Sequence, residues 1–191
     1  MTISSDNLDK LKWHVRRSRL VLDNSWAKVR CDTCELPDGS TIDEYYYWEG
    51  GDFAQVFALT GDEKVVLTRQ YKHAVKEVVL ELPAGLIVGD LEAPLAAAKR
   101  ELQEETGFVA GHWLDLGPLN VSSAKSTTRA YAFFAQEAKR ISNQQLDVNE
   151  QIDVLVVPID ELLQMIRDGQ IRDVNSIAIT FLVLQKLGRR L

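Results

Sequence analysis

The sequence predicts an α/β fold in which a mixed sheet is covered by helices on both faces, preceded by an antiparallel β-rich segment. Runs rich in Val, Tyr and Trp fill the first half of the chain, a helical period appears at residues 93–106, and strand-like runs then resume before two closing helices. Strands that alternate with helices and also form hairpins are typical of a mixed sheet between helical layers.

The β-rich segment is expected to span residues 1–50. Its three strands are predicted by runs of β-branched and aromatic residues, and the cluster Pro37-Asp38-Gly39 provides a turn before the last of them. The three runs are residues 13–22, 27–34 and 41–48. Because three strands bury too little surface for a core of their own, we expect this segment to be a dimerisation element of a homodimer.

The main domain is expected to span residues 51–191. Two apolar runs, 53–59 and 64–70, flank Thr60-Gly61-Asp62-Glu63, which is a hairpin pattern. The helix at 93–106 is predicted by Pro94 in its first turn, a run of alanines, and Gly107 as a left-handed C-cap. Further strands are expected at residues 113–119, 129–135 and 152–157, and further helices at residues 159–167 and 174–187.

Composition narrows the classes of partner. The chain has 191 residues, and 28 acidic against 22 basic side chains give a formal net charge of −6. This balance argues against a nucleic-acid partner, and no apolar run is long enough to cross a membrane. Residues 1–12 lack the apolar core of a secretory signal, so we expect a cytoplasmic protein. Cys31 and Cys34 fall on a predicted strand, and the three histidines show no spacing that would complete a zinc site.

Three carboxylates share one face of the predicted helix. Glu101, Glu104 and Glu105 stand at i, i+3 and i+4 near its C-terminal end, where each like-charge pair costs about 0.2–0.5 kcal/mol. A solvated charged face is the ordinary interpretation of such a run. Here, however, the opposite face is apolar, and a Pro-Ala-Gly turn with free backbone carbonyls precedes the helix. Carboxylates beside such a turn predict a site of hard oxygen ligands, suited to Mg²⁺ or Mn²⁺. The apolar positions are Leu95, Ala98, Leu102 and Phe108.

This segment resembles the Nudix box, G-x5-E-x7-R-E-U-x-E-E-x-G-U, where U is a bulky apolar residue. The matching residues, in order, are Glu92, Arg100, Glu101, Leu102, Glu104, Glu105, Gly107 and Phe108. One departure is visible, because six residues separate Gly85 from Glu92 where the family has five. We expect the extra residue to bulge the loop at 87–91, with consequences for the Ala84 carbonyl and Gly85. The runs 67–72, 81–85, 149–152 and 166–173 extend the resemblance to the ADP-ribose pyrophosphatase branch of the family.

The resemblance implies an α/β/α sandwich and a hydrolase whose cofactor is Mg²⁺, with Mn²⁺ as the alternative. The metal ligands that it implies are the Ala84 carbonyl, Glu101, Glu104 and Glu105. Glu92 would pair with Arg100 to brace the loop, and Gly85 and Gly107 would support the site. The implied base is Glu150 on a mobile loop, with Glu105 as the alternative and Glu104 as a further catalytic carboxylate.

The implied reaction cleaves the pyrophosphate bond of a nucleoside diphosphate linked to another moiety, giving a nucleoside monophosphate and a sugar phosphate. Lys72 stands where the branch has arginine, and the candidate substrate contacts are Arg69, Lys72 and Glu81. Residues 120–128 lack the Pro-Gly and glutamate of ADP-ribose enzymes, so a nucleoside diphosphate sugar fits equally well. Aromatic residues of the β-rich segment would either stack on a base or lie in the core, and we expect the core. They are Trp13, Trp26, Tyr45, Tyr46 and Trp48.

Two competing functions remain open at this point. A non-catalytic Nudix-like domain would sense a ligand, although such domains tend to lose the carboxylates that this chain keeps. A decapping or polyphosphate pyrophosphohydrolase would need a basic surface, against which the net acidity counts. Turnover of a nucleoside diphosphate derivative, set against binding without turnover, would separate these classes.

Overall fold

The computed structural model describes residues 9–89 and 91–189. The contacts between residues divide the chain into two compact units, Met1–Gly51 with Asn120–Thr128, and Asp52–Leu119 with Arg129–Leu191. The segment 120–128 was expected in the main domain, but it belongs to the smaller unit. Trp48 and Ser126 form a parallel bridge, and the Tyr45 hydroxyl donates a hydrogen bond of 2.6 Å to the carbonyl oxygen of Ala124.

The smaller unit is an antiparallel sheet with the strand order β1-β2-β3. Its strands are β1 (His14–Asp23), β2 (Lys28–Glu35) and β3 (Thr41–Trp48), close to the predicted runs. Asp32 on the central strand is buried and accepts hydrogen bonds from Ser18 at 2.5 Å and from Tyr47 at 3.0 Å. Burial, followed by the hydrogen bond to Asp32, raises the pKa of Tyr47 to about 12.

The aromatic residues of the smaller unit do not form a core, contrary to expectation. Trp26 is 90% exposed and Trp48 is 52% exposed, because no helix covers this sheet within the described residues. Trp13 and Tyr46 are also exposed, while Tyr45 lies partly covered beneath the ammonium group of Lys125. The two cysteines of this unit are free and buried.

The larger unit is built on an eight-stranded sheet in which β11, β5, β4, β10 and β8 are neighbours in that order. In addition, β6 pairs with β5, β7 with β4, and β9 with β10. The β4–β10 pair is parallel, whereas β4–β5, β4–β7, β5–β6, β5–β11 and β8–β10 are antiparallel, so the sheet is mixed as predicted. The strands are β4 (Phe53–Thr60), β5 (Lys64–Lys72), β6 (Glu77–Glu81), β7 (Ala84–Leu86), β8 (Phe108–Val109), β9 (His112–Asn120), β10 (Arg129–Arg140) and β11 (Ile152–Pro158).

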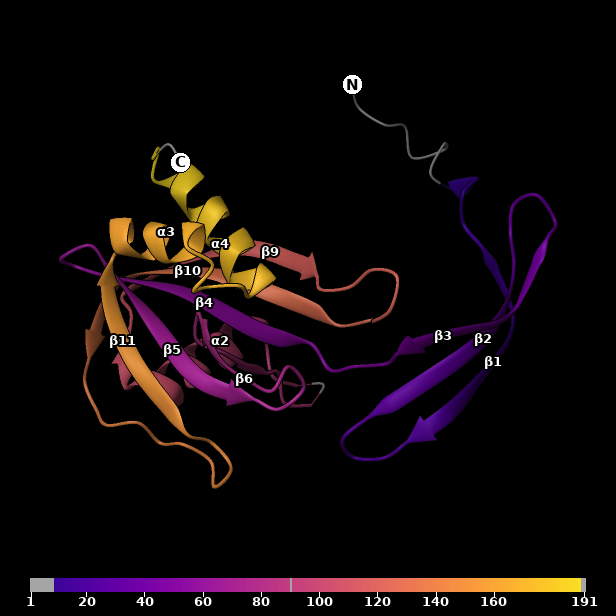
Figure 1. Ribbon diagram of the computed structural model, residues 1–191, viewed down its shortest axis with the longest axis horizontal. Coiled ribbons are helices and arrows are strands. Elements are labelled where there is room, and N and C mark those ends of the chain that lie inside the picture. Colours follow the sequence, from indigo (N-terminus) through magenta and orange to yellow (C-terminus); the bar gives the residue numbers. More distant parts are fainter. Residues whose placement is uncertain (1–8, 90, 190–191) are drawn as a thin grey trace. The chain divides into compact units, whose positions relative to one another are not determined.

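Helices cover both faces of this sheet, as Figure 1 shows. Helix α2 (Pro94–Thr106) packs on one face, and helices α3 (Ile159–Arg167) and α4 (Val174–Lys186) pack on the other. Successive side chains of a strand point to opposite faces, and β4 obeys this rule: Val56 packs in the core beneath α2, and Phe57 in the core beneath α3 and α4. The two cores hold the end of α2 and the turn before β7 in place.

Helix α2 ends as predicted. Gly107 has φ 76°, its N–H donates to the carbonyl oxygen of Gln103 at 2.8 Å, and a Cβ at this position would lie 2.2 Å from the Ser142 carbonyl oxygen. Any larger residue would be strained twice. Leu95, expected in the core, is partly exposed because it lies in the first turn of the helix.

Two short strands, β7 and β8, were not predicted from the sequence. They have only three and two residues, which is too few to show any alternation. None of the described helices is both long and apolar enough to span a membrane.

Candidate active site

Arg100 organises the acidic end of helix α2. Its Nε donates to Glu92 at 2.8 Å, and one terminal nitrogen donates to Glu101 at 2.6 Å and to Glu104 at 3.0 Å. The other terminal nitrogen donates to the Leu86 carbonyl oxygen at 2.9 Å and to Glu92 at 3.1 Å. The five N–H donors of a planar guanidinium suffice for all five of these hydrogen bonds, whereas a lysine ammonium has only three donors. The structure thus pairs Glu92 with Arg100, as expected.

Glu92 closes the loop that carries the extra residue. Its carboxylate also accepts a hydrogen bond of 2.6 Å from the Val88 N–H. The bonds from Arg100, and then the one from Val88, lower the pKa of Glu92 to about 2. Gly89 has φ 68°, so the chain turns in the left-handed region within this loop. The bulge expected at 87–91 includes residue 90, which lies outside the described residues.

Glu105 is buried against the turn before β7. Its side chain is only 5% exposed, and its carboxylate accepts a hydrogen bond of 3.0 Å from the Ala84 N–H. Among the described residues, no Lys or Arg side chain is hydrogen-bonded or ion-paired to it. Burial raises the pKa of Glu105 to about 8, against the lowering effect of the Ala84 hydrogen bond. This carboxyl group therefore lies where a cation would be needed to keep it ionised at neutral pH.

Glu101 lies over Gly85, the residue that follows Ala84. A Cβ on Gly85 would be 1.9 Å from the Glu101 carboxyl carbon, so only glycine leaves room for this carboxylate. Burial raises the pKa of Glu101, and Arg100 opposes that rise. The carboxylates of Glu101 and Glu105 thus meet the same two-residue segment, Ala84 and Gly85, although they come from a helix and the segment belongs to a strand.

Glu104 lies on α2, and Glu150 lies on the loop that precedes β11. The Glu104 side chain is 40% exposed and is held by Arg100. The Glu150 carboxylate accepts a hydrogen bond of 3.0 Å from the Asp147 N–H, and it is near enough to Glu101 to raise that residue's pKa. The structure therefore places Glu101, Glu104 and Glu105 together at the end of α2, whereas Glu150 is linked to them only through its effect on the pKa of Glu101.

The donor set fits a hard divalent cation. Carboxylate and carbonyl oxygens are the ligands that Mg²⁺ and Mn²⁺ prefer, and a buried carboxylate without a cationic partner is the position that such an ion would stabilise. In the part of the chain that the structure describes, no three acidic, His or Cys side chains already converge as a metal cluster. Arg100 holds two of the carboxylates in hydrogen bonds, so binding an ion there would require Glu101 or Glu104 to reorient.

A cavity of about 260 Å³ opens beside the turn. Lys72 and Glu81 lie on its wall together with Ala84 and Gly85. The Lys72 ammonium is 2.6 Å from a carboxylate oxygen of Glu81. Burial raises the pKa of Glu81, and Lys72 opposes that rise. A larger cavity of about 540 Å³ shares Lys72 and Glu81 and continues along the β5–β6 hairpin towards the α3–α4 connection.

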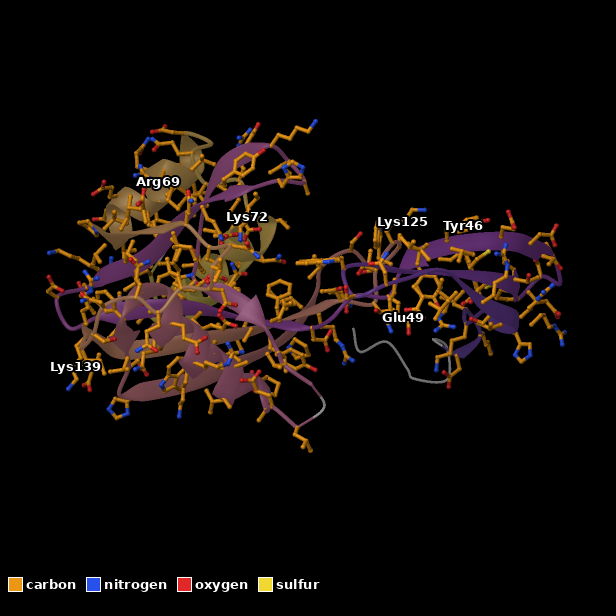
Figure 2. All side chains as sticks on the ribbon, turned by 90° about the horizontal axis from the view of Figure 1, so that it is seen from below. Tyr46, Glu49, Arg69, Lys72, Lys125 and Lys139 are labelled. Atoms are coloured by element: carbon orange, nitrogen blue, oxygen red, sulfur yellow. The ribbon has the colours of Figure 1, made fainter. Side chains whose placement is uncertain are left out.

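The structure does not bring Arg69 to these cavities. Its guanidinium pairs with Asp153 at 2.6 Å, because the two residues are cross-strand partners in β5 and β11. Residues three apart on a strand point to opposite faces, so Arg69 and Lys72 diverge, and Figure 2 shows them apart. The sequence-based expectation that Arg69 contacts substrate is not supported by this placement.

Sequence reasoning missed a buried polar group beside the site. Gln55, Asp173 and Ser176 connect β4 to the start of α4, and Gln55 and Asp173 line the smaller cavity. Two signals were present: a lone glutamine inside an otherwise apolar strand, and an aspartate three residues before a serine at a helix start. Neither signal alone reveals that the two elements meet.

Comparison with known proteins identifies the class. The NUDIX domain model matches residues 53–177, and the model named nucleoside diphosphate sugar hydrolase N-terminal domain matches residues 13–48. The chain belongs to the Nudix family and is a Nudix pyrophosphatase. The resemblance predicted from the Nudix box is confirmed.

Individual relatives cover most of the chain. The methanol dehydrogenase activator of Bacillus methanolicus is 32% identical over 167 residues, covering 84% of this chain and 86% of that protein. The ADP-ribose pyrophosphatase of Bacillus subtilis is 27% identical over 154 residues, covering 80% and 82%. The GDP-mannose pyrophosphatase of Klebsiella pneumoniae is 31% identical over 179 residues, covering 87% and 89%.

A solved structure confirms the fold. The crystal structure of an ADP compounds hydrolase superposes with a TM-score of 0.81 at 22% identity and covers 94% of this chain and 97% of that one. The predicted α/β/α sandwich with an N-terminal antiparallel sheet is therefore correct.

Proposed function

We propose that this protein hydrolyses the pyrophosphate bond of a nucleoside diphosphate linked to a sugar, either ADP-ribose or a nucleoside diphosphate sugar such as GDP-mannose. The products would be a nucleoside monophosphate and a sugar phosphate. One observation carries the proposal: the buried Glu105 carboxyl, without a cationic partner among the described residues, faces the same backbone segment as Glu101. The names of the relatives support the substrate class.

The proposed cofactor is Mg²⁺, with Mn²⁺ as the alternative, held by Glu101, Glu104, Glu105 and the Ala84 carbonyl. When bound, such an ion supplies positive charge against the diphosphate and lowers the pKa of a coordinated water. The protein's own part is to hold the carboxylates. Arg100 and Glu92 brace the loop and the helix, Gly85 leaves space for Glu101, and Gly107 ends the helix.

The proposed base is Glu150, and Glu105 is the alternative. Glu150 lies on a loop between β10 and β11, is held only by the Asp147 N–H among the described residues, and can therefore turn towards a substrate. Glu105 is fixed by burial and suits an ion ligand better than a proton carrier. Glu104, half-exposed beside them, would help to hold the ion.

Lys72 is the proposed contact for the diphosphate. It lines both cavities, and its pairing with Glu81 holds the ammonium beside Ala84 and Gly85. Glu81 would accept hydrogen bonds from sugar hydroxyl groups while it keeps Lys72 in place. A lysine meets phosphate as a point charge, without the bidentate geometry of arginine.

We further propose a cytoplasmic homodimer formed through the smaller unit. Every residue of β1 is exposed, and apolar side chains such as Val15 and Leu22 lie on the surface. An exposed edge strand of this kind is a template for pairing with a second chain. The free thiols of Cys31 and Cys34 suit a reducing compartment. A monomeric mass by light scattering would refute the dimer.

A substrate panel tests the reaction. The chain is incubated with ADP-ribose, GDP-mannose and other nucleoside diphosphate sugars at equal concentration with Mg²⁺, and release of nucleoside monophosphate is measured. We expect turnover of at least one compound, and loss of turnover in Glu105→Gln with an unchanged circular dichroism spectrum. Binding of a compound without turnover by the wild-type chain would instead favour a sensor and refute the enzymatic proposal.

A further inference from the structure

A buried polar cluster joins two elements that are distant in the sequence. Gln55 lies on β4 and Ser176 in the first turn of α4, and each is only 2% exposed. The Gln55 side-chain nitrogen donates to the Ser176 hydroxyl oxygen at 3.1 Å. Both residues are buried beside the apolar core that contains Leu82, and Gln55 also lines the smaller cavity. Unpaired polar groups in buried positions are costly. Contact with water does not explain polar side chains in such a position, so their hydrogen bonds to the rest of the chain must do so.

The cluster holds both backbone polar groups of one residue, Leu82. The Leu82 N–H donates to the Ser176 hydroxyl at 2.9 Å, and the Leu82 carbonyl oxygen accepts from the Gln55 amide at 3.2 Å. The Ser176 hydroxyl donates a hydrogen bond of 2.7 Å to the Asp173 carboxylate, and this bond orients the hydroxyl. The lone pairs of the Ser176 oxygen therefore remain available to accept from the Leu82 N–H. Asp173 also accepts from the Ser176 N–H at 2.7 Å and thereby caps helix α4.

Leu82 directly precedes the backbone of the candidate metal site. After Leu82, the Pro83 carbonyl oxygen accepts from the Val56 N–H at 2.9 Å, and the Ala84 N–H donates to Glu105 at 3.0 Å. The backbone from Leu82 to Ala84 is therefore fixed by β4, α4 and α2 together. Release of the Leu82 end would let Ala84 and Gly85 shift relative to α2.

We propose that Ser176 and Gln55 are positioning residues for the metal site. They hold the Leu82 backbone, and through it they place the Ala84 carbonyl and Gly85 against the carboxylates of Glu105 and Glu101. The inference rests on the proposed function, because it assumes that an ion is held there. Removal of a partner that orients metal ligands typically lowers metal affinity by about 10-fold to 100-fold.

Helix α4 supplies a matched control. Thr180 lies one turn after Ser176, is also 2% exposed, and its hydroxyl has no hydrogen-bond partner among the described residues. The Thr180→Val variant removes a buried hydroxyl from the same helix without touching Leu82. Ser176→Thr keeps the hydroxyl and should rescue the site.

The experiment measures Mn²⁺ binding to the full-length chain through the electron paramagnetic resonance signal of free Mn²⁺, with thermal unfolding recorded for each variant. We expect the Kd for Mn²⁺ to rise about tenfold or more in Ser176→Ala and to stay within about threefold of wild type in Ser176→Thr and Thr180→Val. Gln55→Met, which removes the bond to the Leu82 carbonyl, should raise the Kd in the same direction and replaces Ser176→Ala if that variant does not fold.

An unchanged Kd in Ser176→Ala or in Gln55→Met, or an equal loss of affinity in Thr180→Val, would overturn the positioning role. A wild-type chain that binds Mn²⁺ but hydrolyses no nucleoside diphosphate would overturn the proposed function alone, and the Kd values would still decide the role of Ser176. A wild-type chain that binds no Mn²⁺ would overturn both.

Discussion

Gly85→Ala should disable the site while it leaves the fold intact. The added Cβ would lie 1.9 Å from the Glu101 carboxyl carbon and 2.2 and 2.3 Å from its two oxygens. Carbon atoms in contact are about 3.5–4.0 Å apart, so the carboxylate must withdraw by about 1.6–2.1 Å. The atoms displaced are the far end of a flexible side chain, and Gly85 does not have positive φ, so the backbone can remain in place.

The expected loss follows from that displacement. A misplacement of about 1 Å at a reacting centre costs about 100-fold in rate, which corresponds to about 2.7 kcal/mol. We therefore expect kcat for ADP-ribose or GDP-mannose to fall about 100-fold, with a higher Mg²⁺ concentration needed for half-maximal rate. The assay measures initial rates over a Mg²⁺ titration, and thermal unfolding without metal should be close to that of wild type.

Two variants make the test specific. Gly61→Ala is the control, because a Cβ there would have no atom within 4 Å and Gly61 has no positive φ either. Glu101→Asp shortens the side chain and removes the clash, so adding Gly85→Ala to Glu101→Asp should cost far less than it costs in wild type. A Gly85→Ala enzyme with wild-type rate and Mg²⁺ dependence would refute the reasoning.

Three further predictions concern charge. Burial raises the pKa of Glu105 from 4.5 to about 8. The contribution of this group to the stability of the metal-free fold is therefore complete below about pH 4.5 and is lost as the pH rises to about 8. Urea unfolding in the presence of a chelator should give a smaller free energy of unfolding at pH 8 than at pH 5. A lysine has fewer N–H donors than an arginine, so Arg100→Lys leaves some of the hydrogen bonds to the carboxylates and to the Leu86 carbonyl unmade. This loss should lower the unfolding free energy by roughly 2 kcal/mol. Lys72→Ala should raise KM about tenfold, and Arg69→Ala should leave KM unchanged.

Each of these has a contrary outcome. The pH prediction fails if metal-free stability rises between pH 5 and pH 8, or if Glu105→Gln shows the same pH dependence as wild type. An Arg100→Lys variant as stable as wild type would mean that the guanidinium bonds contribute nothing net. If Arg69→Ala raised KM as much as Lys72→Ala, the ion pair with Asp153 would have to open during substrate binding.

Local patterns predicted the helix and the motif because their geometry is set within a few residues. The i, i+3, i+4 spacing places Glu101, Glu104 and Glu105 on one helix face in any fold, and Gly107 ends that helix through its own left-handed backbone. The short strand β7 escaped prediction because its pairing with β4 is decided by residues about 30 positions away.

The three carboxylates differ in burial and in contacts, and these differences do not follow from local patterns. Helical spacing is local, so the chain's own pattern already placed these acids on one helix face beside an E-L-P-A-G turn. Tertiary contacts were needed to bury Glu105, to leave Glu104 half-exposed and to set Glu101 against Gly85. Burial depends on what packs against the helix, here β7 and its anchors on β4 and α4, and those contacts join segments that no local pattern connects.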